Sequence, residues 1–299
     1  MNLWSFALLL PTKVVFLHGI LTHMRLNFHF LITTFLFLTV FTPLAKAQNL
    51  GVYPTTLDFR LSGGQSEAQV INLSNGSASK VQFRIYLNDW VRDSTGGHIY
   101  FEPASLGRSC AKWMTIDKNF VELQPGESTQ LTAQMLVPST PEATAEMKWA
   151  MLFIETVEEN VSRNDKNAQA TVKNLIRVGV HVYQTPPNVT EKGIKVLDLK
   201  PNPEIANAYD LVCKNTGDVM IECKAHLELA AANGEQTKLD FIEFPMFPEQ
   251  VRLVTFELPK NLPEGKYSAL GILDAGEDLS LEAIESNIEV KPMPKENSK

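Results

Sequence analysis

Short runs in which apolar and polar residues alternate recur from residue 50 to residue 290. Turn sequences such as "SNGS", "QPGES", "NTGD" and "LPEGK" separate these runs. A period of two places successive side chains on opposite faces of a strand, whereas an amphipathic helix repeats about every 3.6 residues. Helical periodicity is almost absent in this part of the chain. The pattern therefore predicts an all-β protein made of sandwiches or barrels.

The runs fall into two groups on either side of a proline-containing segment. We expect strands at 50–61, 67–73, 80–91, 113–116, 119–123, 129–137, 147–157 and 172–183, and then at 194–199, 207–214, 219–230, 236–243, 251–258, 265–273 and 281–290. Between the groups, "TPPNVTEKG" at 185–193 indicates a semi-rigid linker. We therefore expect two tandem β-sandwiches, at residues 48–187 and 188–299, the second ending in a disordered tail.

The first 47 residues contain no Asp or Glu, and an apolar run at 28–44 precedes "AKA" at 45–47. A basic start, an apolar middle and a small-residue exit predict a signal peptide over residues 1–47, with Met24 as a candidate working start. A transmembrane anchor is the alternative. The expected location of the mature protein is the periplasm or the outside of the cell, with no stable membrane insertion after cleavage.

Without residues 1–47 the chain has 24 basic and 34 acidic residues, a net charge of −10, which argues against a nucleic-acid partner. The three cysteines, Cys110, Cys213 and Cys223, all follow this segment. Cys213 and Cys223 flank the "NTGD" turn, and an oxidising compartment permits a disulfide. The spacing alone does not place them opposite each other, so the bridge is left open.

Signals of catalysis are missing. His98, His181 and His226 have no neighbours at metal-ligand spacing, and no nucleophile elbow, phosphate-binding loop or dinucleotide fingerprint occurs. We expect a protein without enzymatic activity, metal or cofactor.

The last strand of the first group contains the sequence "NLIRVGVHVYQTPPNV", residues 174–189. Ile176, Val178, Val180 and Val182 alternate with less apolar residues, and Val172 to Val182 carries only two charges and no proline. Edge strands are usually protected by charge or proline. Two interpretations follow: the apolar face is ordinary core, or part of the strand is an edge that pairs with another protein.

Several segments resemble the N-terminal domain of PapD-like periplasmic chaperones. They are "GVYPTTLDFRL…AQVINLSNGS" at 51–77, "WMTIDKNFVELQPGESTQLTAQMLVP" at 113–138, "KWAMLFIETVEE" at 148–159 and "LIRVGVHVYQTPP" at 175–187. The order of these parts matches the family over most of residues 50–187. The second half shows only generic immunoglobulin or fibronectin type III turns and strands.

The resemblance implies that the chain is all-β, with two tandem immunoglobulin-like β-sandwich domains. It also implies a chaperone of pilus assembly that lends a strand to a client in the cell envelope, such as a pilin-like subunit or a surface component. The implied client-binding residues are Val172, Leu175, Ile176, Val178, Val180 and Val182. The family also grips a carboxylate with an Arg on the first strand and a Lys on the last. Here Val180 takes the position of that Lys, and the nearest basic residues, Arg60 and Arg177, are the candidate carboxylate anchor.

Two other classes of function remain as alternatives. The first is a structural or adhesive surface protein of tandem immunoglobulin-like domains. The second is a carbohydrate-binding module, although the sequence shows no aromatic residues at platform spacing.

Overall fold

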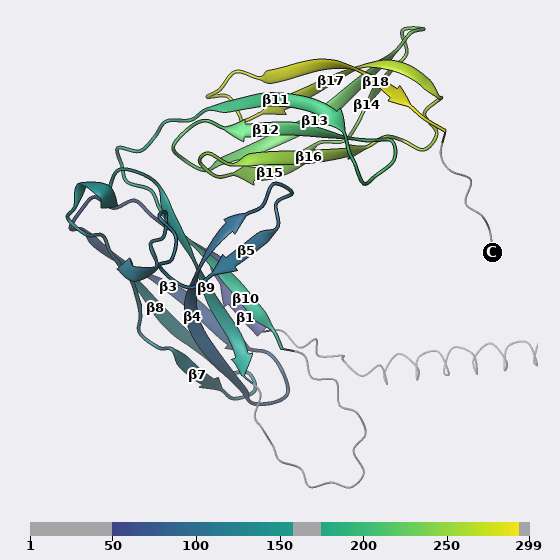
Figure 1. Ribbon diagram of the computed structural model, residues 1–299. Coiled ribbons are helices and arrows are strands. Elements are labelled where there is room, and N and C mark those ends of the chain that lie inside the picture. The colour runs from purple at the N-terminus through teal and green to yellow at the C-terminus, as the bar shows by residue number, and fades with distance from the viewer. Residues whose placement is uncertain (1–49, 158–174, 293–299) are drawn as a thin grey trace, which may run out of the picture. The chain divides into compact units, whose positions relative to one another are not determined.

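The computed structural model describes residues 50–157 and 175–292 and, in this part of the chain, consists of strands with two short 3₁₀ turns, Ala111–Trp113 and Pro141–Ala143 (Figure 1). The prediction of an all-β protein is confirmed. The expected signal peptide and the far end of the expected tail lie outside the described residues. No helix in the described part has the length and apolar character that crossing a bilayer demands.

The strands up to Gln184 form two sheets. One has the order β1-β3-β8-β6, with β1 at Leu50–Tyr53, β3 at Ser66–Asn75, β8 at Ser128–Leu136 and β6 at Met114–Ile116. The other has the order β2-β10-β9-β4-β5, with β2 at Thr56–Phe59, β10 at Arg177–Gln184, β9 at Lys148–Val157, β4 at Val81–Arg92 and β5 at His98–Phe101. β7 at Phe120–Leu123 also pairs with β4.

The strands from Ile194 onward form two further sheets. The smaller has the order β11-β12-β16, with β11 at Ile194–Pro201, β12 at Ala208–Asn215 and β16 at Val251–Glu257. The larger has the order β14-β13-β17-β18, with β14 at Gln236–Lys238, β13 at Ile221–Ala231, β17 at Gly265–Asp274 and β18 at Glu282–Val290. β15 at Ile242–Met246 pairs with β13 as well.

Each pair of sheets encloses its own apolar core. In the first, Phe59, Leu73, Leu131, Leu152 and Val182 are among the fully buried side chains. In the second core, the fully buried side chains include Leu211, Ala225, Leu227, Met246 and Leu273. Burial of these apolar faces is the main favourable contribution to folding. It follows directly from the alternation in the sequence.

Three expected strands differ in the structure. The run 50–61 divides into β1 and β2, which belong to different sheets, and the run 236–243 divides into β14 and the start of β15. β10 begins at Arg177 rather than at residue 172, and Val172 lies outside the described residues. The short strand β5 was not expected at all, because four residues give too little alternation to recognise.

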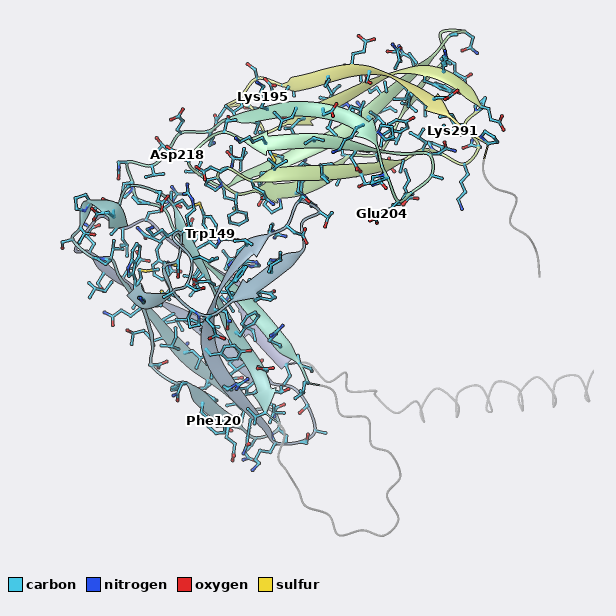
Figure 2. The ribbon with its side chains drawn as sticks, in the orientation of Figure 1. Phe120, Trp149, Lys195, Glu204, Asp218 and Lys291 are labelled. Atoms are coloured by element: carbon cyan, nitrogen blue, oxygen red, sulfur yellow. The ribbon has the colours of Figure 1, made fainter. Side chains whose placement is uncertain are left out.

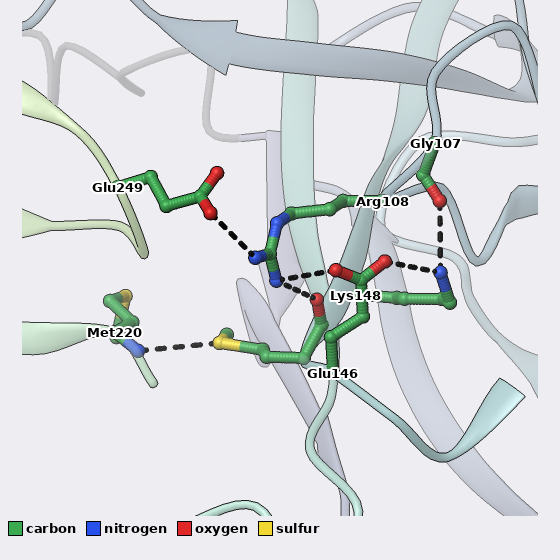
Figure 3. Close-up of polar contacts among 7 residues, drawn as sticks. Gly107, Arg108, Glu146, Lys148, Met220 and Glu249 are labelled. Atoms are coloured by element: carbon green, nitrogen blue, oxygen red, sulfur yellow. Dashed lines mark hydrogen bonds and ion pairs between the residues drawn. The ribbon is translucent and has the colours of Figure 1, made fainter. Parts of the chain in front are cut away.

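The first sandwich also contains buried polar groups with partners. Trp149, labelled in Figure 2, donates from its indole Nε1 to the carbonyl of Trp90 at 2.8 Å. Lys148 at the start of β9 donates to the carbonyl of Gly107 at 2.9 Å and pairs with Glu146 at 2.8 Å (Figure 3). Arg108 binds the same Glu146 carboxylate at 3.1 Å. These contacts fix β9, the strand beside β10.

Asp89 is the most heavily bonded of these groups. Its carboxylate is 1% exposed and accepts hydrogen bonds from the backbone N–H groups of Ala104, Ser105 and Leu106 and from the Ser109 hydroxyl. A carboxylate that satisfies several orphan donors at once holds the segment after β5 against β4.

We expect Asp89→Ala to lower the free energy of unfolding by about 3–5 kcal/mol, because it leaves several buried donors unpaired. Urea unfolding followed by tryptophan fluorescence measures the loss. Asp117→Ala is the matched control, since Asp117 is more exposed and accepts one backbone hydrogen bond, from Thr132. Equal losses in the two variants would contradict this role of Asp89.

Candidate strand-addition site

The last strand of the first sandwich has neighbours of unequal length. β10 pairs antiparallel with β9 along its full length, from Arg177 opposite Glu155 to Gln184 opposite Lys148. On its other side β10 pairs in parallel with β2, but only from His181 to Gln184. No strand in residues 50–157 or 175–292 pairs with the β2 side of Arg177–Val180. The first half of β10 is therefore an open sheet edge in the described structure.

The open edge exists because the segment 50–61 is divided between the two sheets as β1 and β2. β1 pairs with β3 in the opposite sheet, and after Pro54 and Thr55 the chain enters β2 and pairs with β10. Proline has no backbone N–H to donate, which suits a break between two paired segments. Because β2 begins only at the level of His181, the preceding half of β10 lacks a partner on this side.

Two hydrogen bonds show which backbone groups point to the open edge. The carbonyl of Ile176 accepts from the N–H of Thr156 at 2.9 Å, on the β9 side. The N–H of His181 donates to the carbonyl of Thr55 at 3.0 Å, on the β2 side. Backbone groups of successive strand residues point to alternate sides. The N–H and C=O groups of Arg177 and Gly179 therefore face the open side.

The side chains of β10 divide in the same way between core and surface. Val180 and Val182 are fully buried in the core of the sandwich, and Val178 is half-buried. Leu175 and Ile176, just before the strand, are 60% and 37% exposed. The two interpretations of this strand therefore apply to different halves: the second half is core, and the apolar start lies at the exposed end.

The end of β10 is fixed more firmly than its start. Gln184 is fully buried, donates to the carbonyl of Leu61 at 2.7 Å and accepts from the Leu61 N–H at 3.3 Å. Thr185 donates its N–H to the carbonyl of Phe59 at 2.9 Å. These three bonds tie the end of β10 to β2 and the residues after it, which leaves the first half as the accessible part.

The predicted carboxylate anchor is not assembled as a pair. Arg60 directly follows Phe59, which pairs with Gln184, seven residues along β10 from Arg177. At about 3.3 Å per residue the two positions lie more than roughly 20 Å apart, so Arg60 and Arg177 cannot hold one carboxylate together. Val180, where the family resemblance implied a Lys, points into the core. A role for Arg60 or Arg177 alone stays a prediction.

Each arginine has a different environment. Arg60 has a side chain that is 67% exposed and lies 3.7 Å from Asp58, an exposed ion pair of small energetic value. Arg177 lies with its guanidinium over the rings of Phe153 and Tyr100, at 4.5 and 5.4 Å from their centroids. A cation held over two aromatic faces is positioned without a carboxylate partner.

A cluster of aromatic and histidine side chains lies on the same outer face of the sheet. His98 on β5 and His181 on β10 approach with their Nε2 atoms 3.4 Å apart, and the Trp90 ring lies 4.8 and 5.2 Å from the two imidazole centroids. The sequence does not predict this contact, because β5 is too short to give a recognisable alternation. Its only sequence signal is the exclusion of His181 from the apolar face of β10.

Burial lowers the pKa of both imidazoles. Desolvation is the main cause for His181, with the charges of His98 and Arg92 adding to it, and the pKa falls to about 4. Desolvation and Arg92 also lower the pKa of His98. Both rings are therefore neutral at neutral pH, which lets them lie head to head.

The other residues singled out in the sequence form no site in the described part. Cys110, Cys213 and Cys223 are buried and unbridged, so the disulfide left open above is not formed. Burial raises the pKa of Cys213 and of Cys223 to about 12, and these thiols are unreactive at neutral pH. Among residues 50–157 and 175–292 no group of three or more His, Cys, Asp or Glu side chains could hold a metal ion.

Comparisons with known proteins give structural similarity only. No family model matches the chain, and no curated protein matches it significantly. Among solved structures, the class 5 fimbriae chaperone CfaA is 15% identical, with a TM-score of 0.42, covering 82% of this chain and all of its own. The Pseudomonas aeruginosa CupB2 chaperone is 12% identical, with a TM-score of 0.42 and coverages of 81% and 100%.

A third similar structure belongs to the CsuC–CsuE chaperone–tip adhesion subunit pre-assembly complex of Acinetobacter baumannii Csu pili. It is 10% identical, with a TM-score of 0.45, covering 79% of this chain and 97% of the other. These fimbrial chaperones are the kind of protein that the sequence resemblance named.

The histidine pair predicts a pH dependence of stability. A histidine whose folded-state pKa lies below its unfolded value of about 6.5 binds fewer protons when folded. The contribution of neutral His181 to the free energy of unfolding is therefore complete above pH ~6.5. It is lost as the pH falls toward about 4, the pKa of folded His181. We expect His181→Gln to flatten the decline of the urea midpoint across this window. A slope as steep as that of the wild type would contradict the assignment, and His226→Gln is the control.

Proposed function

We propose that this chain is an exported, non-catalytic, chaperone-like protein that binds a protein client of the cell envelope by strand addition. The observation that carries the proposal is the open first half of β10, where the backbone groups of Arg177 and Gly179 have no strand partner among the described residues. A partner strand laid along this edge would gain main-chain hydrogen bonds, and alternate side chains on both strands would give selectivity.

The side chains around the edge support the proposal. Leu175 and Ile176 are apolar and exposed, and Val157 at the end of β9, opposite this region, is 39% exposed. An exposed apolar edge that carries Arg177 as its only charge and has no proline is an aggregation hazard. A partner strand that covers the edge removes this hazard. A tandem-sandwich protein with a purely structural role would not require such a partner.

The sequence resemblance to PapD-like chaperones supports the same function, because that family lends the corresponding strand. The client-binding residues under this proposal are Leu175, Ile176 and Val178 by side chain, and Arg177 and Gly179 by backbone. Val180 and Val182 support the strand from the core. The predicted signal peptide would place the protein and its client in the periplasm, and a pilin-like subunit or another surface component is the proposed client.

We expect Leu175→Asp to abolish client capture with little effect on folding, because Leu175 is 60% exposed. Val180→Asp should instead destabilise the sandwich by several kcal/mol, because Val180 is fully buried and the new charge would have no partner. Thermal unfolding separates the two effects.

Client capture is measured by placing a photo-crosslinking residue at Leu175 in the full chain expressed in its own cells. The control position is Gln134 on β8, which is exposed on the other sheet. The proposal expects one or a few envelope proteins linked from position 175 and not from position 134. The same adducts from both positions would rule out strand lending, and so would an affinity-tagged Leu175→Asp chain, without the crosslinking residue, that recovers as much of the linked protein as the tagged wild type.

A further inference from the structure

Arg177 is a cation at the open edge that forms no ion pair with another described residue, although its charge helps to lower the pKa of Glu155, which lies opposite it on β9. Its guanidinium is exposed and lies over Phe153 and Tyr100. The nearby carboxylate of Glu155 is already engaged: it accepts from Arg84 at 2.8 Å and from the Tyr86 hydroxyl at 2.8 Å. The guanidinium N–H groups of Arg177 are therefore available to an acceptor from another molecule.

The aromatic rings restrict where that acceptor can lie. The Phe153 and Tyr100 rings meet edge to face at 71° and cover the guanidinium on two sides, so an acceptor has to approach its N–H donors from the remaining sides. The same contacts limit the rotamers of Arg177, so less conformational entropy is lost when a partner binds. Arginine suits this position better than lysine because its planar fork binds a carboxylate through two parallel hydrogen bonds.

The strand geometry fixes which residue of a partner would meet this group. The side chain of Arg177 lies on the outer face of the sheet, where Gly179 carries no side chain, whereas the side chains of Ile176 and Val178 lie on the same face as the buried Val180. A strand added beside β10 places each of its side chains on the face of its nearest neighbours, with Cβ atoms about 4.5–5.5 Å apart. Its outer-face residues therefore stand beside Arg177, and its inner-face residues stand beside Ile176 and Val178.

We propose that the partner segment is an amphipathic strand that alternates apolar residues with at least one Asp or Glu, whose side-chain carboxylate binds Arg177. The inference rests on the proposed function, since it specifies the chemistry of the strand that the open edge accepts. Charge complementarity supports it, because Arg177 is a cation beside the open edge of a chain that is acidic overall. That acidity also disfavours polyanions such as nucleic acids as occupants.

The test uses nine-residue peptides that are acetylated and amidated, so that side chains carry the only carboxylates. Apolar residues occupy alternate positions, and the central residue of the other face is Glu, Gln or Lys. We expect the wild-type chain to bind the Glu peptide three- to tenfold more tightly than the Gln peptide, and the Lys peptide most weakly. Fluorescence anisotropy of labelled peptides measures the three values of Kd.

Charge reversal at Arg177 gives the sharper comparison. Arg177→Glu should invert the order, so that the Lys peptide binds best, and Arg177→Lys should keep the order with a smaller ratio. The control is Lys195→Glu on β11, which makes the same reversal of charge at an exposed lysine of the second sandwich (Figure 2). This variant should leave the order of the three peptides unchanged. Melting temperatures confirm that each variant is folded.

The outcomes separate the two proposals. Equal binding of all three peptides to wild type and Arg177→Glu would overturn the acidic-strand inference and leave strand addition intact. No binding of any peptide would contradict both. Association of the peptide-free chain into a dimer that Leu175→Asp dissociates would show that a second copy occupies the edge, and would also overturn the inference.

Discussion

The mismatch in length between β2 and β10 is the constraint on which this account depends. β10 has eight residues, all paired with β9, but only its last four pair with β2. β1 does not supply the missing pairing, because it belongs to the other sheet, where it pairs with β3. The change of sheet between Tyr53 and Thr56 therefore leaves a defined stretch of backbone without a partner strand in the described residues.

The two halves of β10 divide support and binding between them. Val180, Val182 and Gln184 are buried and hold the second half of β10 in the core. The first half keeps its strand conformation through its pairing with β9 alone. A strand that is already extended loses little conformational entropy when a partner pairs with it. On the outer face, the stacked Arg177 and the His98–His181 contact pack β5 over the same sheet.

Much of the fold could be predicted from the sequence, because alternation reports directly which side chains are buried. Val180 and Val182 follow the period of β10, and Phe83 and Ile85 follow that of β4. Alternation does not report which strand lies alongside. It therefore could not show that residues 50–61 divide between two sheets, which is the feature that opens the edge.

The site was predicted less well than the fold, for the same reason. The exposed apolar start of β10 was expected, but Arg60 and Arg177 were paired by analogy, and only the parallel register of β2 and β10 shows how far apart they lie. The aromatic rings beneath Arg177 come from β9 and from β5, and β5 has too few residues to give a recognisable pattern. Contacts between strands distant in sequence have no local signal.

Amide hydrogen exchange of the client-free protein tests the open edge most directly. The N–H groups of Val178 and Val180 point to β9, and that of His181 donates to Thr55. The account predicts slow exchange at these three amides and fast exchange at Arg177 and Gly179, which lie between and beside them in the same strand. Protection of Arg177 and Gly179 equal to that of their neighbours would show that the edge is already covered, and would contradict the account.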